Sequence, residues 1–135
     1  MKKNLIITAL VCLFGIAKVN AQVADTAKVN ANSPEISFTT TEHDYTSIEV
    51  GGNGTYKFTF TNIGKTPLIL TNVVSSCGCT TPIWPKAPIK PGEKAEIEVG
   101  YNTNIVGPFS KQITVFSNGK TSPIVLRIKG EVKSK

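Results

Sequence analysis

Residues 56–61 read YKFTFT, with aromatic side chains at Tyr56, Phe58 and Phe60 and polar side chains between them. Successive side chains of an extended strand point to opposite faces, so this alternation places the three rings together on one face. Aromatic and β-branched residues also suit a pleated sheet. The stretch therefore predicts a strand with one face in a hydrophobic core and the other in water.

The same alternation recurs elsewhere, and turn residues separate the runs. The other alternating runs are Ile36 to Phe38, Ala95 to Tyr101 and Ile124 to Ile128, and the expected turns lie at 51–54, 64–67, 91–92, 107–108 and 118–119. Asn118-Gly119 is a strong hairpin signal, and no window keeps a helical period. About seven short strands, with turns about every 8–12 residues, predict an all-β fold, an immunoglobulin-like β-sandwich.

The first 21 residues have the features of a secretory signal peptide. Lys2 and Lys3 form a basic start, an apolar run follows over 5–17, and small residues lead up to Ala21. The run is shorter than the roughly 20 residues that a spanning helix needs. We therefore expect cleavage between Ala21 and Gln22, and no stable membrane span in the mature chain.

Export has consequences for location, domains and charge. The expected location is the periplasm or cell surface of a Gram-negative-type bacterium. The polar residues 22–34 are predicted to be a flexible linker, followed by a sandwich over 35–132 and a tail over 133–135. Loss of the signal removes three lysines and lowers the formal net charge from +6 to +3. No basic cluster remains, so the composition does not favour nucleic acid as a partner.

Two cysteines, Cys77 and Cys79, remain once Cys12 leaves with the signal. In the first interpretation they are structural, packed at an edge of the sandwich. In the second they are redox-active, because export favours a disulfide. The entropy of a three-residue loop gives such a bridge only about 1.6 kcal/mol, so it would be a poor staple. In the third they bind a soft ion such as Cu(I), although tetrahedral zinc needs four ligands.

Trp84 lies in a segment that prolines make stiff, and the segment starts directly after the cysteines. Trp84 either covers the end of the core or forms a partner-binding loop with Pro85 and Lys86, since rigid aromatic side chains make good anchors. Because the segment adjoins Cys79, the cysteines and this loop are candidates for one shared surface.

Fingerprints of catalysis and nucleotide binding are missing from the mature sequence. GxGxxG, the P-loop, HExxH and GxSxG are absent. The single histidine, His43, is interpreted as a surface or hydrogen-bonded residue near a sheet edge. We therefore expect no enzyme and no cofactor, but a binding or scaffold module. Its expected partner is an envelope protein or peptide, taken up as an extended segment at a sheet edge.

Three motifs carry a family resemblance: TNIG at 61–64 with Pro67-Leu68, SCGCT at 76–80, and WPK at 84–86 followed by PGE at 91–93. With them, about residues 35–132 resemble the DUF1573 family of exported bacterial proteins of unknown function. The resemblance implies an immunoglobulin-like sandwich related to major sperm protein, pilus-chaperone and Hydin-type domains, and no assigned reaction. It implies that the distinctive positions are Cys77, Gly78, Cys79, Thr80, Trp84 and Pro85.

Overall fold

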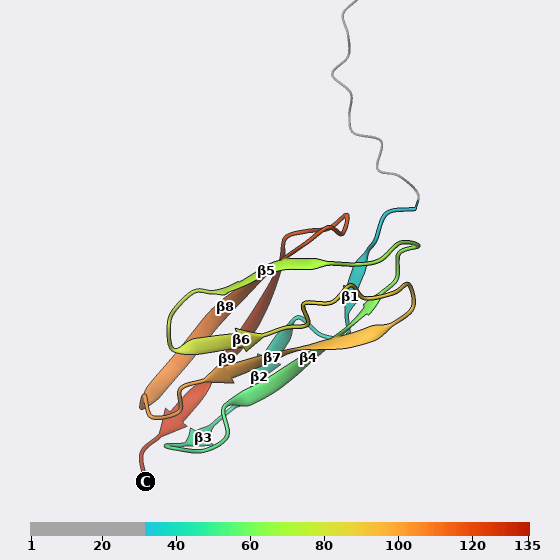
Figure 1. The fold of residues 1–135 in the computed structure, drawn as a ribbon. Helices are drawn as coiled ribbons and strands as arrows, with labels where there is room; N and C mark the ends of the chain where they lie inside the picture. The colour runs from blue at the N-terminus through green and yellow to red at the C-terminus, as the bar shows by residue number, and fades with distance from the viewer. Residues whose placement is uncertain (1–31) are drawn as a thin grey trace, which may run out of the picture.

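The computed structural model describes residues 32–135, which form nine β-strands in two stacked sheets (Figure 1). The expected signal peptide, its cleavage point at Ala21 and Gln22, and residues 22–31 of the expected linker lie outside the described residues. No helix long and apolar enough to cross a membrane occurs within the described range.

The first sheet has the strand order β1-β4-β7-β6, and all of its pairings are antiparallel. Its strands are β1 (Ile36–Phe38), β4 (Thr55–Asn62), β7 (Lys94–Tyr101) and β6 (Thr80–Ile83). The second sheet has the order β2-β9-β8-β5, and β3 also pairs with β9. Its strands are β2 (Glu42–Asp44), β3 (Ile48–Glu49), β5 (Leu70–Ser75), β8 (Gly107–Ser117) and β9 (Ile124–Lys133).

The all-β sandwich is confirmed, but nine strands replace the expected number of about seven. β2 and β3 have three and two residues, too few to show a period of two, and they form because β9 offers them a parallel partner. The segment that became β6 contains Pro82, and a proline argues against a strand assignment from sequence.

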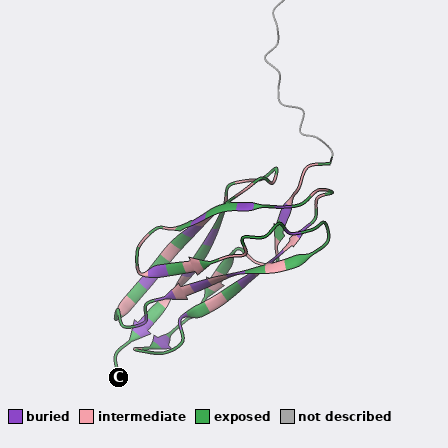
Figure 2. Ribbon diagram, viewed as in Figure 1, coloured by how far each residue is buried: buried purple, intermediate pink, exposed green. Residues whose placement is uncertain are grey.

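The core lies between the inner faces of the sheets, as the alternating buried and exposed bands of the strands show (Figure 2). Phe58 pairs in register with Ile97, and both side chains are fully buried. Ile113 and Leu126 supply the facing layer from β8 and β9. Full burial of such side chains contributes about 1.5–3 kcal/mol each, so the alternation seen first in residues 56–61 sets the core.

The predicted Asn118-Gly119 hairpin is confirmed as the connection between β8 and β9. The expected turn at 107–108 is wrong, because Gly107 and Pro108 are the first two residues of β8 and pair with β9. A proline is tolerated near the first residue of a strand, and Gly107 supplies the positive φ of 123° there. β9 also extends to Lys133, the first residue of the expected tail.

The side chain of Asn62 joins three segments at the end of β4 where the chain leaves the first sheet. Its Nδ2 donates to the carbonyl oxygens of Thr66 and Ile89, both at 2.9 Å, and its Oδ1 accepts from the backbone N–H of Gly64 at 2.9 Å. The side chain is fully buried. One amide therefore holds the loop that leads into β5 against the loop that follows β6.

Replacement of Asn62 by alanine should leave the buried Ile89 carbonyl and the partly buried Thr66 carbonyl and Gly64 N–H without their side-chain partner. Each unsatisfied buried group costs about 1–3 kcal/mol, so Asn62→Ala should lower the free energy of unfolding by about 3 kcal/mol. Chemical denaturation measures this, with Asn104→Ala as the matched control because Asn104 is exposed. An equal, small effect of both substitutions would show that the Asn62 amide does not organise these loops.

Candidate functional site

Two edge strands from different sheets, β5 and β6, lie on the same side of the sandwich and are consecutive in the chain (Figure 1). Residues 76–79 connect them, so the Cys77-Gly78-Cys79 segment crosses from one sheet to the other. At the far end of this side, Leu68 and Ile89 form an isolated bridge with reciprocal backbone hydrogen bonds of 2.8 Å. The cysteine loop and this bridge therefore fix the two ends of one side of the sandwich.

Cys77 and Cys79 are joined by a disulfide and both are half-buried. The Ser75 hydroxyl lies 2.7 Å from the Cys77 carbonyl oxygen and 2.8 Å from the Thr80 carbonyl oxygen, so its hydrogen is shared between them. A Cβ at Gly78 would meet open space, and its φ lies outside the left-handed region, so the loop geometry does not itself require glycine. The loop is thus held by hydrogen bonds as well as by the disulfide.

The outer edge of β6 is closed to a further strand. The Asn102 N–H donates to Cys79 at 2.9 Å, and bonded pairs alternate along an antiparallel ladder, so Thr80 and Pro82 direct their backbone groups away from β7. Thr80 already donates to the Cys77 carbonyl and accepts from Ser75. Pro82 has no N–H to offer. The Thr80 N–H is occupied and Pro82 has no N–H, so this edge offers no free donor to an added strand over these residues.

The outer edge of β5 is largely open. Ser76 donates to the Gln112 carbonyl at 2.9 Å, so by the same alternation Val73 and Ser75 direct their backbone groups away from β8. The Val73 N–H is held by the Asn72 side chain at 2.9 Å. Within residues 32–135, the Val73 carbonyl and the Ser75 N–H have no partner. β5 has six residues, whereas the edge strands β1 and β2 have three each.

The residues of the predicted partner-binding loop are divided between the core and the solvent. Trp84 is half-buried and packs against the core, while the exposed Lys86 ammonium lies 3.0 Å from the centre of its ring in a cation–π contact. Pro85 is half-buried. The exposed apolar side chain of this segment is Ile83, with 61% of its surface accessible. This placement favours the role of Trp84 as a cover for the core.

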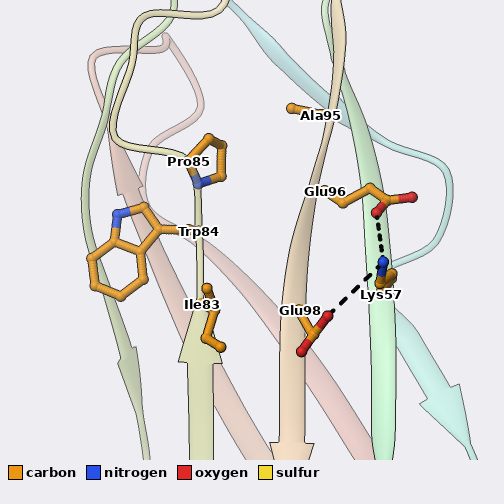
Figure 3. A pocket seen from close by; sticks show the side chains of 7 residues that line it. All are labelled: Lys57, Ile83, Trp84, Pro85, Ala95, Glu96 and Glu98. Atoms are coloured by element: carbon orange, nitrogen blue, oxygen red, sulfur yellow. Dashed lines mark ion pairs between the residues drawn. The ribbon is translucent and has the colours of Figure 1, made fainter.

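An open depression of about 520 Å³ lies on the outer face of the first sheet (Figure 3). Its lining residues are Lys57, Ile83, Trp84, Pro85, Ala95, Glu96 and Glu98. Lys57 is paired with Glu96 at 3.4 Å and with Glu98 at 3.9 Å. The Trp84 ring points away from this hollow, on the other side of β6 from the carboxylates. The charges in the depression are therefore already paired.

His43 lies in β2, at the opposite edge of the second sheet from β5. Its ring stacks on Tyr56 at 3.6 Å between centroids and meets the edge of Tyr45 at 4.4 Å. Burial lowers the pKa of His43, and Asp44 partly opposes this. Burial also raises the pKa of Tyr45 to about 12, and its hydroxyl donates to the Gly54 carbonyl at 2.9 Å.

The residues that the sequence singled out do not form one site. The structure brings Cys77 and Cys79 near the start of β6 and Trp84 near its end, but it places His43 at the other edge. Among residues 32–135 no group of three or more His, Cys, Asp or Glu side chains is arranged to hold a metal ion. The sequence analysis missed the β5 edge and the exposed Val74 and Ile83. Adjacent residues of a strand face opposite sides, so one of the neighbouring Val73 and Val74 must face outward. A single pair of valines does not tell from sequence which of the two is exposed.

The model of the family DUF1573, protein of unknown function, matches residues 36–132. A comparison with curated proteins finds no match. A protein of unknown function from Porphyromonas gingivalis W83 has a TM-score of 0.68 at 18% identity, and the match covers 76% of this chain and 48% of that one. The chain thus spans about half the length of that protein.

Two further solved structures have related folds. The ASH / PapD-like domain of human CEP192 has a TM-score of 0.64 at 8% identity, with 77% of this chain and 89% of that one covered. The CsuC-CsuE chaperone-tip adhesion subunit pre-assembly complex of Acinetobacter baumannii has a TM-score of 0.53 at 18% identity, with 75% and 57% covered. At these identities the likeness shows the fold alone, an immunoglobulin-like and PapD-like sandwich.

The lowered pKa of His43 predicts that acid destabilises the fold. The unfolded chain, with a histidine pKa near 6.5, binds the proton more tightly than the folded one. Stability should therefore be full above about pH 6.5 and fall as the pH drops through 6.5 toward the folded value. Thermal unfolding from pH 8 to pH 5 measures the slope, and His43→Gln should flatten it. A melting temperature that rises on acidification would show that attraction of the charged ring to Tyr56 outweighs desolvation.

Proposed function

We propose that this chain, which belongs to the DUF1573 family of proteins of unknown function, is a non-enzymatic binding module of the bacterial cell envelope. The observation that carries the proposal is the contrast between two neighbouring edges. The β6 edge is blocked by Pro82 and by the bonds of Thr80, whereas β5 keeps unpaired backbone groups. An edge strand left open beside a protected one is suited to strand addition.

Binding by strand addition depends on the direction of backbone N–H and carbonyl groups and needs no reactive side chain. Main-chain hydrogen bonds would supply affinity at β5, and the side chains that flank the edge would supply selectivity. The outward carbonyl of Val73 and N–H of Ser75 are the bonding groups available for an extended partner. The partner class is an envelope protein or peptide with an extended segment. The pairing requires no cofactor.

Export is part of the proposal, since a binding role in the envelope needs the signal peptide at residues 1–21. Photo-crosslinking in cells tests binding and location together. A benzophenone amino acid at position 74, beside the open edge, should yield several-fold more adducts than one at position 83, beside the blocked edge, because only the former lies next to a bound strand. Fractionation of the same cells should recover the protein from the envelope with Gln22 as its first residue.

Equal adduct yields at positions 74 and 83 would contradict strand addition at β5. Val74 and Ile83 are both exposed aliphatic residues on neighbouring edge strands, so position 83 is a matched control. Adducts at neither position would contradict the binding function itself.

A thiol-redox protein is the second candidate, and the disulfide between Cys77 and Cys79 favours it. The two cysteines enclose a three-residue loop, for which the chain-entropy relation gives only about 1.6 kcal/mol of stabilisation. Hydrogen bonds from Ser75 and Thr80 hold the same loop without the disulfide. A bond that contributes so little to stability is better suited to reversible chemistry than to stapling.

Removal of the disulfide should therefore cost little stability. The double variant Cys77→Ser, Cys79→Ser should lower the free energy of unfolding by less than about 2 kcal/mol. The wild-type pair should equilibrate with glutathione at a potential less negative than about −300 mV, the range of structural disulfides. Alkylation followed by mass spectrometry measures that potential. A larger loss of stability, or a pair that resists excess reduced glutathione, would identify the bond as a structural staple.

A further inference from the structure

The open β5 edge raises the question of which extended segments it selects. We infer that it selects acidic ones: a strand with net negative charge that adds beside β5 and places an aliphatic side chain next to Val74. This inference rests on the proposed function and specifies the chemistry of its partner. Three observations carry it: the direction of the β5 backbone groups, an apolar surface beside them, and the distribution of charge around them.

The first observation is that β5 can form a ladder on its outer side. The bonded pairs with β8 place the backbone groups of Val73 and Ser75 on that side, two residues apart. This spacing matches the repeat with which an added strand exchanges hydrogen bonds. The Asn72 side chain occupies the Val73 N–H, and an incoming carbonyl would have to replace that single local bond.

The second observation is an exposed apolar surface on the outer face of the second sheet. Val74, Thr114 and Val125 lie side by side on β5, β8 and β9, because register pairs Val74 with Thr114 and Thr114 with Val125. Phe116 projects from the same face as Thr114. The exposed fractions of Val74, Val125 and Phe116 are 45%, 47% and 38%. An added strand would bring every second side chain onto this surface beside Val74.

The third observation is that lysines outnumber acids in the segments beside the open edge. Residues 64–93 comprise β5, β6 and the loops beside them, and they contain three lysines, Lys65, Lys86 and Lys90, and one acid, Glu93. The Glu93 carboxylate accepts a hydrogen bond from the backbone N–H of Lys90 at 2.9 Å. β8, the partner strand of β5, contains Lys111 and no acid. The nearby carboxylates of β7 lie on the outer face of the other sheet, where Lys57 pairs with Glu96 and Glu98. The balance of charge is therefore positive, and a negatively charged strand meets net attraction here.

The same distribution disfavours a second copy of this chain as the occupant. Antiparallel pairing of two β5 edges would bring the lysines beside the edge, among them Lys65 and Lys90, close to their counterparts in the other copy. Like charges brought together at an interface are unfavourable. Charge complementarity thus favours an acidic strand over self-pairing.

Two heptapeptides that differ only in charge test the inference. One alternates valine with glutamate and the other alternates valine with lysine, so both have the same tendency to form strands. Fluorescence anisotropy with the full mature chain should show at least about tenfold tighter binding of the glutamate peptide at low salt. The difference should shrink as the salt concentration rises toward about 1 M, because salt screens surface charges.

Substitutions at exposed positions locate the site without unfolding the protein. Val74→Glu should weaken binding of the glutamate peptide about tenfold, while Val74→Lys should preserve or strengthen it. Ile83→Glu on the blocked β6 edge should change it less than about twofold and serves as the control. Circular dichroism melting curves verify that all three variants fold.

Several results would overturn the inference. Equal binding of both peptides would remove the preference for acidic segments and leave strand addition intact. Loss of binding in Ile83→Glu but not in Val74→Glu would move the site to the depression beside β6. Sedimentation that shows a dimer abolished by Val74→Glu would identify the occupant as a second copy. If neither peptide binds while position 74 still forms adducts in cells, the inference fails and the proposed function stands.

Discussion

The buried amide of Asn62 is the interaction on which the arrangement of the two edge strands depends. Its hydrogen bonds to Thr66 and Ile89 tie together the loop before β5 and the loop after β6. Leu68 and Ile89 then bridge these segments directly, so the two strands start and end at fixed points on opposite sheets. No aliphatic side chain could replace these bonds, because the Ile89 carbonyl is buried, the Thr66 carbonyl is partly buried, and both need a donor. One polar side chain in the core thus positions an edge that lies at the surface.

Edge strands of a sandwich expose backbone groups, and the edge strands β5 and β6 differ in how many of these groups are already bonded. Along β6, the residues that bond to β7 alternate with residues whose backbone groups face outward. Thr80 and Pro82 are the outward-facing residues. The Thr80 groups are already bonded, and Pro82 has no N–H. On β5, only the Asn72 side chain guards the outer side. If both edges were protected against strand addition, the outward backbone groups of β5 would be occupied or missing as they are on β6. This asymmetry between two strands joined by four residues is therefore the feature that supports the proposed function.

Much of the fold could be predicted from local sequence, and less of the candidate site. Phe58 and Ile97 lie in long alternating runs, where one buried face creates a strong periodic signal. β2 and β3 could not be found in this way, because they are too short for a period and exist only through pairing with β9. Pro82 argued against a strand, and only the register with β7 reveals that its missing donor faces outward. The open edge of β5 is likewise a property of pairing, because it depends on the absence of a neighbouring strand beyond β5 in the second sheet.

The cysteine loop and the open edge meet at one residue, and this links the two candidate functions physically. The Ser75 hydroxyl holds the loop through the carbonyl groups of Cys77 and Thr80, while the Ser75 N–H is one of the unpaired groups of the β5 edge. A rearrangement of residues 76–79 would change the hydrogen bonds of the Ser75 hydroxyl, next to the last backbone donor of the edge. In the oxidised loop, Ser75 is held at one position at the end of β5. The hydrogen bonds and the disulfide together order the loop at this end of β5, and order present before binding lowers the conformational entropy that an open strand loses when a partner binds.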